Sequence, residues 1–167
     1  MRIDTIDRIE YVKEMVNEII QRSKCDPSNA YIHLYGVSHF CAMIAMKRGI
    51  DVELAVIAGM MHDIYSYSCG ETKDHAKKGA IMAGEILRTL GTFTNEEMKL
   101  ICDAISHHSS KNKCDGDLDE VLKDADVLHH CIYTLGKNVA DKEKKRWETL
   151  KDEFNMNAEG SREWRDV

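Results

Sequence analysis

The chain has 167 residues, enough for one domain with a full hydrophobic core. Its formal net charge is −6, with no basic tail and no basic helix face, so duplex nucleic acid and anionic membranes are not expected partners. One proline, few aromatic residues and no alternating apolar run predict a mostly helical protein.

The longest apolar run is too short to span a bilayer. The first residues also lack the basic-then-apolar layout of a secretion signal. Six cysteines are scattered along the chain without a C-x-x-C pair, and we interpret them as reduced thiols. These features together predict a cytoplasmic protein.

Apolar residues at helical spacing predict a first amphipathic helix over residues 5–23. Asp26 and Pro27 then form the pattern of an N-cap followed by proline at the first helical position. The helix that they open should run to about residue 48. Its buried stripe includes His33, at a position where a core residue is expected.

The segment 54–63 is apolar, rich in small residues, and ends in His62 and Asp63. A buried carboxylate is costly unless it is paired or binds a metal. Because consecutive helical residues diverge by about 100°, these two side chains straddle a point that a cation can occupy. The alternative is a buried His–Asp hydrogen bond near a helix end.

Residues 66–73 are polar and predict a loop. Asp74 is a candidate N-cap for the next helix, whose first turn holds His75 on the inward side and which should end at Gly91.

Thr94 or Asn95 should open the following helix. Its apolar face continues directly into His107 and His108, and a charged loop at 111–117 comes next.

A helix at about 118–135 places Asp126 on its inner side. From residue 139 on the sequence is strongly charged, but Trp147, Leu150 and Phe154 share one helical face. We expect a helix that packs against the domain or against a second copy of the chain, followed by a frayed tail.

Five predicted helices therefore carry a histidine or an acid at an inward position, at or near an end. Several buried imidazoles and carboxylates in one small core are unfavourable unless a cation collects them. Imidazole nitrogen with carboxylate oxygen suits Mn, Fe, Co, Ni or Zn better than Ca. The set is large enough for one or two ions, and Asp63 is the most natural bridge between two.

The order H…HD…D resembles the HD superfamily of metal-dependent phosphohydrolases, over about residues 28–136. The segments 33–37, 60–64 and 123–128 carry the resemblance, and 74–80 and 104–109 look like the additional ligands of binuclear members such as the bacterial dinucleoside tetraphosphate hydrolases. The resemblance implies an all-α HD-domain helical bundle with the metal site in its core. We expect a single domain over 1–167, with an N-terminal helix in 1–27, the metal-binding core in 28–136, and a C-terminal helix and tail in 138–167.

The resemblance also implies roles for individual residues. His62 and Asp63 would be catalytic, and the metal ligands would be His33, His62, Asp63, His75, His107, His108 and Asp126. Asp124 competes with Asp126, which we prefer because a short apolar run follows it. The substrate-binding candidates are Lys73, Lys78 and Lys111, for which solvated surface is the other interpretation.

The sequence departs from the family's pattern in several places, and the lysine that commonly follows the His-Asp pair is missing, with Lys73 the nearest candidate. Tyr65 stands where the family often has a glycine, and the Gly-Tyr-Pro signature of cyclic dinucleotide phosphodiesterases is absent, which argues against that activity.

The implied reaction is hydrolysis of a phosphomonoester, a nucleotide or a dinucleoside polyphosphate, by a water that the metal makes acidic. Two alternatives share the same ligands: a mixed-valent di-iron oxygenase of the HD fold, and a nucleotide-binding module that the metal only holds together. The expected partners are a small phosphorylated substrate and, for the C-terminal helix, a homodimer.

Overall fold

In the computed structural model we describe residues 5–23 and 25–156. This part of the chain is all helical and contains no strand, as the sequence predicts. Its helices are α1 (Thr5–Arg22), α2 (Pro27–Arg48), α3 (Val52–Met61), α4 (Ile64–Cys69), α5 (His75–Leu90), α6 (Asn95–His107), α7 (Asp117–Tyr133) and α8 (Lys144–Glu153).

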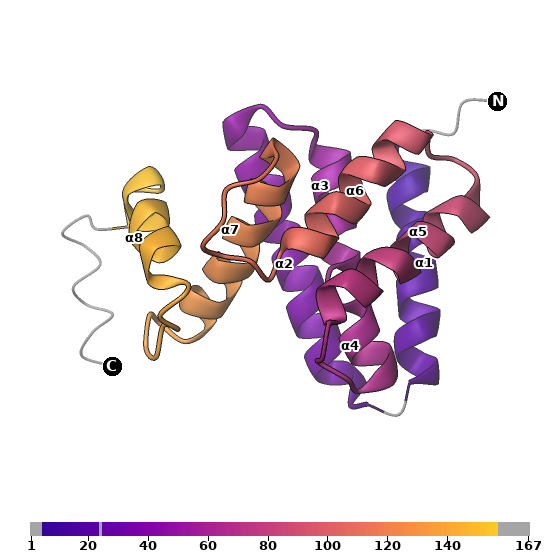
Figure 1. Ribbon diagram of the computed structural model, residues 1–167, viewed down its shortest axis with the longest axis horizontal. Coiled ribbons are helices and arrows are strands. Elements are labelled where there is room, and N and C mark those ends of the chain that lie inside the picture. Colours follow the sequence, from indigo (N-terminus) through magenta and orange to yellow (C-terminus); the bar gives the residue numbers. More distant parts are fainter. Residues whose placement is uncertain (1–4, 24, 157–167) are drawn as a thin grey trace.

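Helix α2 occupies the middle of the bundle and packs against α3 and α7 (Figure 1). Helices α5 and α6 pack on each other, and α1 and α8 lie at opposite ends of the molecule. One cluster of buried apolar side chains runs through these elements, from Val12 in α1 to Leu150 in α8. The histidines and acids of interest are therefore held by helices that share a core.

Two helix starts agree with the sequence. The side chain of Asp26 accepts a hydrogen bond from the backbone N–H of Ser28, and Pro27 is the first residue of α2. Thr94 and Glu97 form a reciprocal capping box at the start of α6.

Three details near the histidines differ from our expectations. Residues 64–69 form the short helix α4, where the polar sequence predicted the start of a loop; Ile64 is fully buried there, and packing overrides the local propensity. Asp74 does not cap α5, because its backbone is left-handed (φ 55°) and its side chain makes no capping hydrogen bond. Helix α3 also ends at Met61, so that His62 and Asp63 lie in the turn between α3 and α4.

Helix α3 can approach α2 closely because residue 59 is glycine. A Cβ at Gly59 would lie 2.7 Å from the Cα and 3.0 Å from the backbone nitrogen of Ser38. Neither atom can move without shifting α2. The small residues of segment 54–63 thus bring the start of the His62–Asp63 turn against the helix that carries His33.

We expect Gly59→Ala to lower the free energy of unfolding by about 1–3 kcal/mol, the usual cost of overpacking a core. Gly84→Ala is the matched control, because the nearest atom to its Cβ is the Sγ of Cys102 at 3.3 Å, and that side chain can adjust. Urea denaturation of the two variants measures the difference. Equal stability of both would show that the α2–α3 distance is not set at Gly59.

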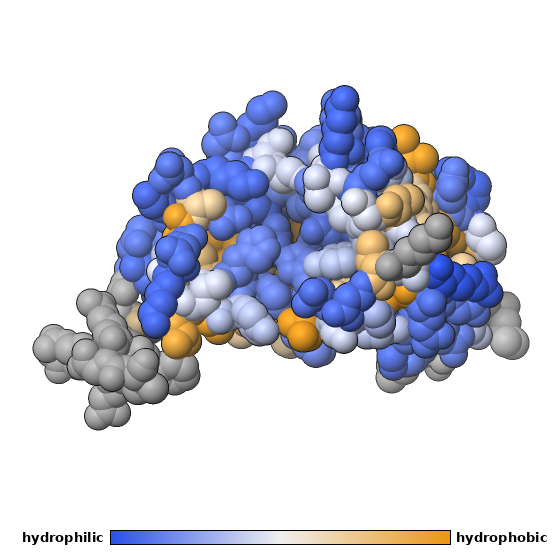
Figure 2. All heavy atoms as spheres, turned by 90° about the horizontal axis from the view of Figure 1, so that it is seen from below, coloured by the Kyte–Doolittle hydropathy of each residue, from blue (hydrophilic) through white to orange (hydrophobic). Residues whose placement is uncertain are grey.

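Helix α8 packs on α7, with Leu150 buried and Trp147 and Phe154 partly buried against the core. The expected tail at 157–167 lies outside the described residues. Figure 2 shows a mainly hydrophilic face with small apolar groups. Among the described helices, none is both long enough and apolar enough to cross a membrane.

Candidate metal centre

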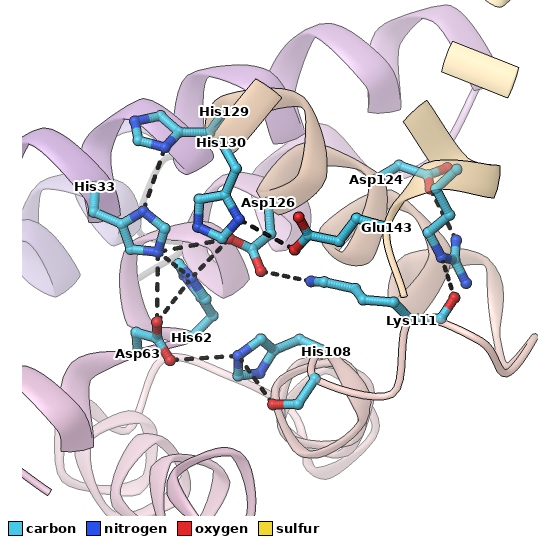
Figure 3. Close-up of polar contacts among 12 residues, drawn as sticks. His33, His62, Asp63, His108, Lys111, Asp124, Asp126, His129, His130 and Glu143 are labelled. Atoms are coloured by element: carbon cyan, nitrogen blue, oxygen red, sulfur yellow. Dashed lines mark hydrogen bonds and ion pairs between the residues drawn. The ribbon is translucent and has the colours of Figure 1, made fainter. Parts of the chain in front are cut away.

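Six of the predicted side chains meet at one place in the bundle. They come from α2, from the turn between α3 and α4, from the first residue of α5, from the residue after α6 and from the middle of α7. The close-up in Figure 3 shows most of them pointing toward a common centre. The six are His33, His62, Asp63, His75, His108 and Asp126.

One half of this cluster surrounds the Nε2 atoms of His33 and His62, which are 3.0 Å apart. Asp63 Oδ2 lies 3.4 Å from the His33 nitrogen and 3.6 Å from the His62 nitrogen. Asp126 Oδ1 lies 3.6 and 3.8 Å from the same two atoms. Four ligand atoms thus converge on one point.

The other half surrounds Oδ1 of Asp63. That oxygen is 3.3 Å from His75 Nε2 and 3.3 Å from His108 Nε2, and the two nitrogens are themselves 3.3 Å apart. The two oxygens of one carboxylate therefore face two different sets of imidazoles. This arrangement is what a carboxylate bridging two cations requires.

The backbone fixes the tautomer of three of these imidazoles. The Nδ1 of His62 donates to the Gly59 carbonyl (2.9 Å), that of His75 to Thr72 (2.8 Å) and that of His108 to Ile105 (2.7 Å). Gly59 and Ile105 lie in the last turns of α3 and α6, where carbonyls have no i+4 helical donor; the Ile105 carbonyl also accepts from the backbone N–H of His108 at 3.5 Å. With Nδ1 protonated, each Nε2 presents a lone pair to the centre.

Electrostatics favour a neutral His62 and ionised carboxylates at Asp63 and Asp126. Burial lowers the pKa of His62 to about 3. Burial opposes ionisation of Asp63, but His62, His108 and His33 hold the pKa of its carboxyl below the usual range. Burial opposes ionisation of Asp126 in the same way, and Lys111 and His62 hold the pKa of that carboxyl low.

The donor set fits a divalent transition metal. The buried Oδ1 atoms of Asp63 and Asp126 have no hydrogen-bond partner, although buried carboxylate oxygens are normally satisfied. Around Asp63 Oδ1, the Nε2 lone pairs of His75 and His108 converge at 3.3 Å, and around Asp126 Oδ1 those of His33 and His62 converge at 3.6 and 3.8 Å. A cation accounts for both features, and nitrogen with oxygen ligands favours Mn, Fe, Co, Ni or Zn.

Lys111 lies at this centre rather than on the surface. Its ammonium donates to Oδ2 of Asp126 at 2.5 Å, and its side chain is 1% exposed. Arg146 of α8 holds the segment in place, because its guanidinium donates to the carbonyls of Lys111 (2.6 Å) and Lys113 (2.8 Å). We expected Lys111 to bind substrate, but in the structure its charge is directed at Asp126.

Asp124, the competitor for the last ligand position, faces away from the centre. Its carboxylate pairs with Arg48 and Arg146, each at 2.8 Å. Asp124 therefore joins α7 to α2 and α8, and the structure brings Asp126 to the cluster instead.

The structure does not bring three other candidates to the cluster. Nδ1 of His107 lies 2.5 Å from Oδ1 of Asp119, and the His107 side chain is 44% exposed. His107 points away from the cluster because one helical step separates it from His108 by about 100°. Lys78 pairs with Glu71 and Tyr65 on the surface, and Lys73 is exposed in the loop before α5. The structure therefore places His107 outside the ligand set that we expected, while substrate binding by Lys73 and Lys78 stays a prediction.

Two further residues, outside the six, border the centre. His130 Nε2 lies 3.4 Å from Asp126 Oδ1, and its Nδ1 lies 3.2 Å from Glu143 Oε1. The i, i+4 spacing of Asp126 and His130 in α7 was a sequence signal for the first. Glu143 comes from the segment before α8, and no sequence pattern pointed to it.

The sequence model of the HD domain family matches residues 30–130. The chain belongs to the HD domain family. The match confirms the resemblance and the all-helical HD fold. It ends before α8, so the contacts of Arg146 lie outside the part that the family model covers.

This HD domain is similar in sequence to two ribonucleases Y. The enzyme of Mycoplasma mycoides is 33% identical over 115 residues, covering 68% of this chain and 24% of the relative. The enzyme of Geobacter sulfurreducens is 28% identical over 124 residues, covering 73% of this chain and 22% of the relative. The chain therefore spans less than a quarter of the length of these curated relatives.

Among solved structures, this HD domain is similar to a predicted HD superfamily hydrolase from an uncultured Thermotogales bacterium. The TM-score is 0.60 at 24% sequence identity, and the alignment covers 93% of this chain and 91% of the other. At this identity the likeness shows the fold.

Proposed function

We propose that this HD domain is a metal-dependent phosphohydrolase acting on a phosphomonoester, a nucleotide or a dinucleoside polyphosphate. The observation that carries the proposal is the division of the Asp63 carboxylate between two sets of imidazoles, with Oδ1 left unpartnered. Membership of the HD family, and relatives named as ribonucleases Y, support phosphate-ester chemistry.

His33, His62, Asp63 and Asp126 would hold one ion, and Asp63, His75 and His108 the other. When bound, such ions lower the pKa of a water and offset charge on phosphoryl oxygens. Asp63 would contribute one oxygen to each site, and the carbonyls of Gly59, Thr72 and Ile105 keep three ligand rings oriented. Lys111 fixes Asp126 through the oxygen that faces away from the histidines.

The test is an anaerobic purification followed by elemental analysis and a substrate screen. With Mn²⁺ or Fe²⁺ added, we expect release of inorganic phosphate from p-nitrophenyl phosphate or nucleoside monophosphates, or cleavage of dinucleoside polyphosphates into two nucleotides. A short RNA strand belongs in the screen because of the relatives' name, although the net charge of −6 disfavours it. Oxygen uptake on a polyol or a phosphonate would instead indicate a di-iron oxygenase, and tight nucleotide binding without turnover would indicate a binding module.

His75→Ala distinguishes one ion from two. We expect the metal-to-protein ratio to fall from two to one, because His75 contacts only the half of the cluster around Asp63 Oδ1. His107→Ala, a histidine outside the cluster, is the matched control and should leave the ratio at two. An unchanged ratio in His75→Ala would remove His75 from the ligand set.

A further inference from the structure

His33 differs from the other three imidazoles of the centre. Their Nδ1 atoms donate to backbone carbonyls, whereas His33 Nδ1 lies 3.3 Å from Nδ1 of His129. The reason is position. His33 lies inside α2, where nearby carbonyls already accept hydrogen bonds from the helix itself. A side chain from another helix, α7, supplies the acceptor in their place (Figure 3).

The ring of His129 is closely confined on α2. A Cβ at Gly36 would lie 2.4 Å from its Cδ2 and 2.5 Å from its Nε2, so any larger residue at this position would displace the ring. Tyr133 stacks on the other side, with centroids 5.9 Å apart and planes at 13°, and Phe40 meets the ring edge-on at 6.3 Å. One helical turn after His33, α2 thus leaves a space that His129 fills.

The hydrogen-bonding roles of the pair follow from its surroundings. The two nitrogens of the His129 ring face different ways: Nδ1 lies 3.3 Å from Nδ1 of His33, and Nε2 lies against α2 beside Gly36. In the neutral tautomer with the proton on Nε2, His129 Nδ1 faces His33 with a lone pair. His33 Nδ1–H can donate to this lone pair, which leaves His33 Nε2 unprotonated toward His62, Asp63 and Asp126.

We infer that His129 is a positioning residue for His33: it accepts the Nδ1–H hydrogen bond, and so selects the tautomer and ring orientation that present Nε2 to the centre. The consequence for metal binding rests on the proposed function, whereas the tautomer is a property of the metal-free protein. Gly36 supports the same arrangement, because its lack of a side chain makes room for the His129 ring.

One rival use of these residues is a third cation site. Ligand atoms of His33, His129 and His130 all lie within 4.8 Å of one another. In that case His33 would have to give a lone pair on both sides of its ring, and the positioning role would be wrong. The number of bound ions separates the two interpretations.

The first experiment reads the tautomer by ¹⁵N NMR of the imidazole nitrogens in the metal-free protein. We expect His33 to be the Nδ1–H form in the wild type and a mixture of tautomers in His129→Phe, whose ring can still stack on Tyr133. In His129→Gln the amide oxygen can accept the hydrogen bond, and the Nδ1–H form should return. His39→Gln, on the exposed side of α2, is the control. A His33 signal that is the same in His129→Phe and wild type would overturn the inference.

The second experiment measures Mn²⁺ binding by calorimetry. Loss of a hydrogen-bond partner of a metal-ligating histidine typically lowers metal affinity by about 10–100-fold, which we expect for His129→Phe and Gly36→Ala. His129→Gln should remain within about threefold of wild type, as a restored hydrogen bond predicts. If the number of Mn²⁺ ions bound per protein falls from three to two in the His129 variants, His129 is a ligand and the inference is overturned. Should the wild type bind no Mn²⁺, the proposed function fails, while the NMR result still decides the positioning role.

Discussion

Asp63→Asn should remove both ions from the protein and lower phosphohydrolase activity by about three orders of magnitude or more. Among the residues that the structure describes, only Asp63 directs one carboxylate oxygen at each of the two sets of imidazoles. A metal contributes several kcal/mol of transition-state stabilisation, and each 1.36 kcal/mol is a factor of ten in rate. Elemental analysis and phosphate release, measured on the same sample, check the two effects together.

Asp119→Asn is the control for this variant. Asp119 is also a buried carboxylate beside a histidine, but it pairs with His107 outside the cluster. Its replacement should leave metal content and activity near those of the wild type. If Asp63→Asn keeps both ions, or if the two variants lose metal equally, the bridging role of Asp63 is wrong.

Lys111→Met should destabilise the metal-free protein by about 3–5 kcal/mol, because it leaves the buried carboxylate of Asp126 without its ammonium partner. For a chain of this length that corresponds to a fall of roughly 10 °C in Tm. In the metal-loaded protein a cation faces Asp126 from the other side, so the fall should be much smaller. By linkage, the variant should then bind Mn²⁺ at least as tightly as the wild type.

Differential scanning calorimetry with and without Mn²⁺ measures this difference. Lys78→Met is the matched control, since it removes an ammonium that pairs with Glu71 on the exposed surface and should leave Tm almost unchanged. An equal loss of Tm in the metal-free and the metal-loaded Lys111→Met protein would show that Lys111 serves packing and not the charge of Asp126.

The sequence predicted the features that depend on local pattern. Helical periodicity gave the helices, and Asp26, Pro27 and Thr94 marked two of their starts. The order H…HD…D indicated the family, and the six side chains that it pointed to at the ends and inner faces of helices do meet. These features could be predicted from the sequence because a helix cap, a turn of periodicity or one segment of the motif is each encoded within a few residues.

The remaining features depend on contacts between distant segments. His107 and His108 are equivalent by pattern, and only the place of the helix end relative to Asp63 separates them. Lys111 was predicted to bind substrate or to lie on the surface, and no local pattern indicated that Arg146, thirty-five positions later, holds its carbonyl. Glu143 reaches His130 from a segment without periodicity. A single sequence carries no local signal for contacts of this kind.

Anomalous X-ray diffraction from crystals grown with Mn²⁺ tests the central claim most directly, since it locates each ion independently of activity. We predict two peaks that share Asp63: one among His33, His62 and Asp126, and the other between His75 and His108. Peaks only elsewhere, for instance among His107, Asp115 and Asp119, or no peak beside Asp63, would contradict a bridged metal centre in this bundle.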